Sequence, residues 1–233
     1  MASLYLIPTT LGESSLERTI VPYNSQIVRE LKFFIVENIR TARRFIKHID
    51  KSIDIDSLTF FELNEHTKHT EIETFIKPLI EGNDVGIVSE AGCPAVADPG
   101  ALVVEATQKK GLRVVPLVGA SSILLSLMAS GFSGQSFAFN GYLPIDKKTR
   151  RQKIQQLENR VYSEQQTQIF IETPYRNHQL IQDLIDTLRP STLLCIASSL
   201  TTEEETIRTL PISKWKTAKF DYHKKPTIFL IYK

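Results

Sequence analysis

The residues best suited to chemistry lie in one fifteen-residue segment, 86–100, with the sequence GIVSEAGCPAVADPG. Its start predicts a short apolar strand and its end leads into a helix, so the small residues between them form a strand-to-helix loop. A loop with little side-chain bulk at a strand end allows the backbone to approach a ligand, and Glu90 adds a carboxylate. The segment predicts either a ligand-binding loop or a tight structural turn.

Basic residues form two local clusters, although the formal net charge is only +2. One cluster recurs at helical spacing between Arg40 and His48, and a denser one lies between residues 147 and 153. Such residues contact phosphates in nucleic-acid-binding proteins, but they also cover the solvated faces of ordinary helices. The small net charge argues against the broad positive field of many nucleic-acid-binding proteins.

Cysteine content and hydropathy narrow the class of protein. The two cysteines, Cys93 and Cys195, are too few for a disulfide framework and show no zinc-ligand spacing with the histidines, so we expect no metal. The apolar stretch 123–129 is far shorter than the roughly 20 residues that span a bilayer, and no leader-like segment is found at the N-terminus. These features predict a cytoplasmic enzyme or binding protein.

Strands and helices alternate along the first half of the chain, which predicts an α/β fold with a mostly parallel sheet covered on both faces. After residue 118 a Leu- and Ser-rich helix and further strands predict a second α/β subdomain with a mixed sheet, so we divide the chain into 1–117 and 118–233. The predicted strands are 4–7, 31–36, 59–63, 84–89, 113–117, 136–140, 168–172, 192–197, 206–210 and 227–232. The predicted helices include a basic one after residues 37–40 and segments 71–81, 101–106, 148–158 and 177–188.

Seven motifs in order resemble one family over nearly the whole chain. This is the tetrapyrrole methylase superfamily of S-adenosylmethionine (SAM)-dependent methyltransferases, and within it the branch that methylates a ribose 2′-hydroxyl of small-subunit rRNA. The motifs are LYLIPTTLG at 4–12, ENIR at 37–40, NE at 64–65, the segment 86–100, VVPLVGASS at 114–122, GYLP at 141–144 with the following Arg pair, and ETPYR at 172–176.

The resemblance implies two α/β subdomains with SAM in the cleft between them, no metal, and a homodimer. In such families the cofactor is held largely by backbone at strand ends, where small residues let the chain come close. The implied cofactor-binding residues are Pro8, Leu11, Glu90, Gly92, Cys93, Ser121, Ser122, Ile171, Ala197 and Pro226.

The acceptor-side motifs depart from those of the ribose methylases. Their Glu-Asp-Thr-Arg is Glu37-Asn38-Ile39-Arg40 here, and both histidines of their His-x-His-Asn-Glu are absent from residues 61–65. The best-matched candidates for acceptor binding or proton transfer are Glu37, Arg40 and Glu65, with a helix cap or a surface ion pair as the competing role for each.

Six further residues are candidates for substrate binding. Glu172 and Arg176 match a Glu-x-x-x-Arg motif, which indicates an orienting pair or a structural one. The others would contact RNA phosphates without reading sequence; they are Tyr142, Lys148, Arg150 and Arg151.

Our first prediction is a SAM-dependent methyltransferase that acts on a ribose 2′-hydroxyl of small-subunit rRNA. One alternative is a precorrin-like tetrapyrrole C-methylase, in which the basic residues would bind carboxylates. The other is a non-catalytic SAM-binding sensor or assembly factor, which the altered acceptor motifs suggest.

Overall fold

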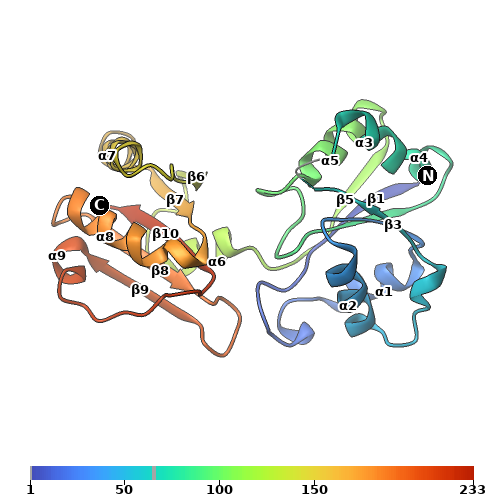
Figure 1. Ribbon diagram of the computed structural model, residues 1–233, viewed down its shortest axis with the longest axis horizontal. Helices are drawn as coiled ribbons and strands as arrows, with labels where there is room; N and C mark the ends of the chain where they lie inside the picture. Colours follow the sequence, from blue (N-terminus) through green and yellow to red (C-terminus); the bar gives the residue numbers. More distant parts are fainter. Residues whose placement is uncertain (1, 65–66) are drawn as a thin grey trace. The chain divides into compact units, whose positions relative to one another are not determined.

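A computed structural model describes residues 2–64 and 67–233. The chain divides into two compact units, Met1–Ser121 and Ser122–Lys233, where the sequence prediction sets the boundary after residue 117. Each unit contains one five-stranded sheet with helices packed on it (Figure 1), which confirms the predicted α/β fold class.

Unit 1 contains a wholly parallel sheet of strand order β3-β2-β4-β1-β5. Its central strands are short runs of apolar residues, as expected where helices cover both faces. Gly86 lets β4 sit close to one helix layer, because a Cβ there would lie 2.6 Å from Ile7 Cδ1 and 2.9 Å from Leu31 Cδ1. The strands are β1 (Ser3–Ile7), β2 (Phe33–Val36), β3 (Thr59–Glu62), β4 (Val85–Val88) and β5 (Arg113–Pro116).

Two helix layers cover this sheet (Figure 1). One core packs α1 and α2 against alternate strand residues such as Phe34, and the other packs α3, α4 and α5 against the intervening ones, such as Ile35. The helices that follow β1 and β2 therefore lie on the opposite face from those that follow β3 and β4. Ligands of open α/β sheets bind where the connections switch faces, here at the carboxyl ends of β1, β2 and β4. The helices are α1 (Pro22–Glu30), α2 (Ile39–Ile49), α3 (His69–Phe75), α4 (Lys77–Ile80) and α5 (Gly100–Lys109).

Proline explains two differences between the predicted and observed helices of unit 1. The single helix predicted at 71–81 is wrong: α3 ends at Phe75 and Pro78 stands in the first turn of a separate α4, because proline cannot donate to the preceding turn. Helix α1 was not predicted, although Pro22 occupies its first position, which is a recognised helix-start signal.

Unit 2 contains a mixed sheet of order β6-β7-β10-β8-β9, in which β6 and β7 are parallel and the other pairs antiparallel. Helices α7, α8 and α9 share one core with β7, β8 and β10, and α6 contacts β9 and β10. Among the described residues, no helix combines the length and apolarity needed to cross a membrane. The elements are α6 (Ser122–Ser130), β6 (Phe137–Tyr142), α7 (Lys147–Glu164), β7 (Thr167–Ile171), α8 (Asn177–Thr187), β8 (Leu193–Ser198), β9 (Thr206–Pro211), α9 (Ile212–Trp215) and β10 (Thr227–Tyr232).

Candidate functional site at the carboxyl ends of the unit 1 strands

The residues that directly follow β1, β2 and β4 are joined by hydrogen bonds. The Thr9 N–H donates to the carbonyl of Gly92 over 2.9 Å, and the Thr9 hydroxyl donates to the carbonyl of Ser89 over 3.2 Å. On the other side, the Glu90 N–H donates to Glu37 Oε1 over 3.0 Å. The loop after β4 is thereby fixed between the ends of β1 and β2, its two neighbours in the sheet.

The loop that follows β4 has an unusual backbone. Gly92, Ala95 and Ala97 all have positive φ angles, of 74°, 65° and 62°. Asp98 compensates by accepting the Ala95 N–H at 2.9 Å and the Gly100 N–H at 2.7 Å, the second of which opens α5. The structural turn that the sequence offered as one alternative is therefore present, and the carboxylate of Asp98 sets its shape.

The segment that follows β5 closes the other side of the loop. A Cβ on Gly119 would lie only 2.2 Å from Pro8 Cβ, and a Cβ on Gly92 would lie 3.3 Å from the Ala120 carbonyl oxygen and 3.0 Å from Leu11 Cδ2. The Cys93 thiol donates to the Ala120 carbonyl over 3.4 Å. Pro8, Leu11, Gly92 and Cys93 therefore gather beside segment 117–121, which ends at the predicted residue Ser121.

Two carboxyl groups, Glu37 beside this loop and Asp98 within it, are partly buried. Burial raises the pKa of Glu37, and the nearby carboxylates of Asp98 and Glu90 raise it further against the lowering effect of the Glu90 N–H. Burial likewise raises the pKa of Asp98. Burial also raises the pKa of the Cys93 thiol, which therefore lacks the character of an activated thiolate.

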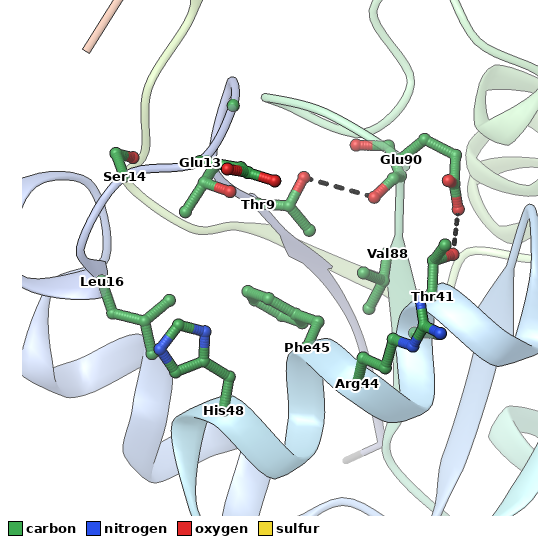
Figure 2. Close-up of a pocket in the computed structure, with 14 residues that line it drawn as sticks. Thr9, Glu13, Ser14, Leu16, Thr41, Arg44, Phe45, His48, Val88 and Glu90 are labelled. Atoms are coloured by element: carbon green, nitrogen blue, oxygen red, sulfur yellow. Dashed lines mark hydrogen bonds between the residues drawn. The ribbon is translucent and has the colours of Figure 1, made fainter. Parts of the chain in front are cut away.

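A cavity of about 410 Å³ opens beside the same edge (Figure 2). Its walls come from the loop after β1, from α2 and from the end of β4. Thr41 Oγ1 on α2 donates a hydrogen bond to Glu90, which connects the helix to the loop after β4. The lining side chains are apolar (Leu16, Ala42, Phe45, Val88), hydroxylic (Thr9, Thr10, Ser14, Thr41, Ser89) and charged or ionisable (Glu13, Arg44, His48, Glu90), with Gly12 completing the wall.

The cofactor residues predicted in the second half of the chain gather in unit 2. Ile228 of β10 pairs with both Ile171 of β7 and Ala197 of β8. Pro226 lies just before β10, and its carbonyl accepts the Ser199 N–H over 2.8 Å. Ile171, Ala197 and Pro226 therefore share one edge of the unit 2 sheet, while Ser122 begins α6.

The acceptor-side candidates are placed unequally. Glu37 lies in the hydrogen-bonded edge described above, and Arg40 is exposed in the first turn of α2. Glu65 lies outside the described residues. Asn38, which replaces a family aspartate, is the N-cap of α2 and accepts the N–H groups of Arg40 and Thr41 at 2.9 Å and 3.2 Å. The substitution preserves the start of the helix.

The prediction that Arg150 contacts RNA phosphate is wrong, because its side chain is only 1% exposed. It binds Asp183 Oδ2 through Nε at 2.9 Å and Nη2 at 2.6 Å, inside unit 2. Arg151 also pairs with Asp183, at 3.2 Å, whereas Lys148 and Tyr142 are exposed. The α7 cluster is therefore partly a structural ion-pair network.

Glu172 and Arg176 form the pair that the sequence suggested. Arg176 donates from Nε and Nη2 to Glu172 Oε1, at 3.0 Å and 2.7 Å. Glu172 is buried at the end of β7, and its second oxygen has no hydrogen-bond partner. Glu172 Oε2 is therefore an acceptor without a partner, directly after Ile171 at the end of β7.

A family model described as Tetrapyrrole (Corrin/Porphyrin) Methylases matches residues 26–215. The chain belongs to the tetrapyrrole methylase family. Its members are methyltransferases that use SAM as the methyl donor. This methylase is similar to proteins named ribosomal RNA small subunit methyltransferase I. It is 29% identical over 230 residues to the one from Vibrio cholerae, covering 98% of this chain and 76% of the relative. It is 30% identical over 212 residues to the one from Pseudomonas aeruginosa, covering 91% and 71%.

Solved structures confirm the fold of the methylase. The crystal structure of the methyltransferase CobJ superposes with a TM-score of 0.64 at 17% identity, covering 99% of this chain and 93% of that one. The uroporphyrin-III-C-methyltransferase from Thermus thermophilus gives a TM-score of 0.56 at 14% identity, covering 100% and 92%. At these identities the likeness concerns the fold alone.

Sequence reasoning missed several residues of the candidate site. Asp98 could have been found, because an aspartate two residues before a glycine commonly caps the local turn with its own carboxylate. Thr9, Thr41 and Phe45 carried no such signal, since their roles depend on which strands are neighbours. Among the described residues, no group of three or more His, Cys, Asp or Glu side chains is arranged to hold a metal ion.

Proposed function

We propose that this methylase transfers the methyl group of SAM to a ribose 2′-hydroxyl of small-subunit rRNA. The acceptor is suggested by the relatives, which are named ribosomal RNA small subunit methyltransferases and cover most of the chain. The structural observation that carries the proposal is the hydrogen-bonded edge itself. There a backbone-rich loop and the partly buried carboxyl group of Glu37 lie next to the exposed basic face of α2.

The residues of this edge fit SAM. A glycine at 92 keeps the loop surface open where any Cβ would press on Leu11, and the exposed carboxylate of Glu90 can accept hydrogen bonds from an amino group or a ribose diol. SAM supplies a methyl group made reactive by its sulfonium. The protein's task is to align that group and exclude water, which is worth on the order of 7–11 kcal/mol when the geometry is right.

Glu37 is our candidate for the proton acceptor. A ribose hydroxyl is a weak nucleophile, and its proton must leave as the new carbon–oxygen bond forms. A carboxylate whose pKa is raised by burial takes up a proton more readily than an ordinary surface carboxylate, and the Glu90 N–H holds Oε1 in place. Arg40 lies in the first turn of α2, four residues after the end of β2, and is our candidate for binding the adjacent RNA phosphate.

The deciding experiment uses small ribosomal subunits isolated from cells that lack the ribose methyl group. The purified protein is incubated with radiolabelled SAM and these subunits, and the RNA is digested to nucleosides for chromatography. We expect label in a single 2′-O-methyl nucleoside, and no incorporation with subunits that are already methylated. Binding of SAM is measured in parallel by calorimetry.

Other outcomes would redirect the assignment. SAM binding without incorporation into RNA would refute the catalytic proposal and favour a SAM sensor. Incorporation only into an anionic tetrapyrrole would favour the C-methylase alternative. Absence of SAM binding would refute the proposed cofactor site.

A further inference from the structure

The 410 Å³ cavity of unit 1 is separate from the cluster of predicted cofactor residues, although the two share a wall. Leu11 points to Gly92, whereas its neighbours Thr10 and Gly12 line the cavity. Glu90 belongs to both, through its place in the loop and its hydrogen bond from Thr41. A ligand in the cavity would therefore lie directly across the loop after β1 from the proposed SAM site.

The cavity has an aromatic floor and a charged rim. Figure 2 shows the Phe45 ring between Leu16 and Val88, with Glu13 on the opposite side. Arg44 and Glu13 are exposed, so their charged ends remain in contact with solvent. The volume falls within the range of about 300–1,000 Å³ that holds a compact organic ligand.

We propose that this cavity receives one unstacked nucleotide of the RNA acceptor, an inference that rests on the proposed function. The Phe45 ring provides a stacking face for the base, as aromatic side chains do in proteins that bind single-stranded RNA. Arg44 contacts the adjoining phosphate, for which a guanidinium is well suited. Hydroxyls and carboxylates of the wall, such as Thr10 and Glu13, accept hydrogen bonds from the base or sugar.

Helix α2 offers matched variants to test this assignment. Arg44 lines the cavity and Lys47 does not, yet both are exposed cations on the same helix, so Arg44→Gln and Lys47→Gln change the net charge equally. Phe45→Leu keeps an apolar side chain but removes the ring. We expect Arg44→Gln and Phe45→Leu to lower kcat/KM for unmethylated small subunits at least tenfold. Lys47→Gln should stay within threefold of the wild-type kcat/KM, and the Kd for SAM should stay within twofold in all three variants.

A second measurement separates this inference from the proposed function. Binding of the four nucleoside 5′-monophosphates is followed by NMR saturation transfer, with the cofactor site filled by S-adenosylhomocysteine. We expect the wild type and Lys47→Gln to bind at least one of them, and Phe45→Leu to weaken that binding at least fivefold. If the wild type binds a monophosphate in this way but methylates no RNA, the proposed function fails and the cavity assignment stands. Three results would overturn the cavity assignment: equal monophosphate binding across all variants, equal kcat/KM across all variants, or no monophosphate binding by the wild type.

Discussion

The substitution Gly119→Ala tests whether the segment after β5 must touch the end of β1. The added Cβ would lie 2.2 Å from both Pro8 Cβ and Pro8 Cγ, where an ordinary contact is at least 3.4 Å, so the two segments must separate by more than 1 Å. Pro8 is a rigid ring and cannot rotate away. The movement would strain the bond from Asn24 Nδ2 to the Val118 carbonyl, now 2.8 Å, and the contact between Cys93 and Ala120.

Overpacking of this kind costs about 1–3 kcal/mol. If SAM binding requires the segment to return to its place, that cost appears as a loss of affinity. At 1.4 kcal/mol per tenfold, the Kd for SAM should rise roughly fivefold to more than a hundredfold. Calorimetry measures the Kd, and differential scanning calorimetry should show a lowered Tm for the same variant.

Gly134→Ala is the matched control, because the nearest atom to its Cβ would be Leu127 Cδ2 at 4.0 Å. It should bind SAM as the wild type does. An unchanged Kd and Tm in Gly119→Ala would show that the close approach of Gly119 to Pro8 does not shape the cofactor site, and the reasoning would be wrong.

Three further variants probe the charged groups. Asp183→Ala should destabilise unit 2 by about 3–5 kcal/mol, because it leaves the Arg150 guanidinium buried without its partner; urea unfolding followed by Trp215, the single tryptophan, measures it. Glu37→Gln should lower kcat at least a hundredfold at neutral pH. In the wild type, a pH–rate profile should show activity falling as the pH drops through the raised pKa of Glu37. Arg40→Ala should leave the Kd for SAM unchanged and lower turnover at least tenfold, measured by methyl incorporation.

The pKa of Glu37 also predicts a pH dependence of stability. Because the folded-state pKa lies above the ordinary value of 4.5, the protonated form favours folding, and this contribution is lost as the pH rises through the folded value. Glu37→Gln should therefore gain stability relative to the wild type as the pH rises through this range. Urea unfolding below and above the folded-state pKa of Glu37 measures the difference in the free energy of unfolding. A constant difference would contradict the partial burial of Glu37.

Contrary results for the other two variants are equally clear. A wild-type unfolding curve for Asp183→Ala would mean that the Arg150 charge is satisfied elsewhere. Unchanged turnover in Arg40→Ala would remove the start of α2 from the acceptor site.

The strands and the two α/β halves could be predicted because buried strands leave runs of apolar residues in the sequence. The misplacement of Arg150 was avoidable in part. Arg150, Ile154, Leu157 and Val161 follow helical spacing, so the arginine falls on the buried stripe of α7. Its partner Asp183 could not be predicted, because Asp183 lies on α8 and only the packing of α7 against α8 brings the pair together.

The candidate site was predictable only where local sequence decides the backbone. The loop within 86–100 could be recognised from its small residues, and its position at a strand end follows from the apolar run before it. The contacts of Thr9 with Ser89 and of Thr41 with Glu90 join residues 80 and 49 positions apart. Such contacts depend on β4 lying between β1 and β2, an order that no local pattern encodes.

That strand order also sets the sequence of events as the chain leaves the ribosome. β2 can pair with β3 early, since Phe33 aligns with Thr59, but β1 has only β4 and β5 as neighbours, and Leu4 aligns with Val85. The first strand therefore waits unpaired until some eighty further residues have been synthesised, and closing such a long loop is slow. Because Thr9 meets Ser89 and Gly92 in the same event, the insertion of β4 provides both the link between β1 and β2 and the hydrogen-bonded edge. A nascent chain that stops before this strand has neither.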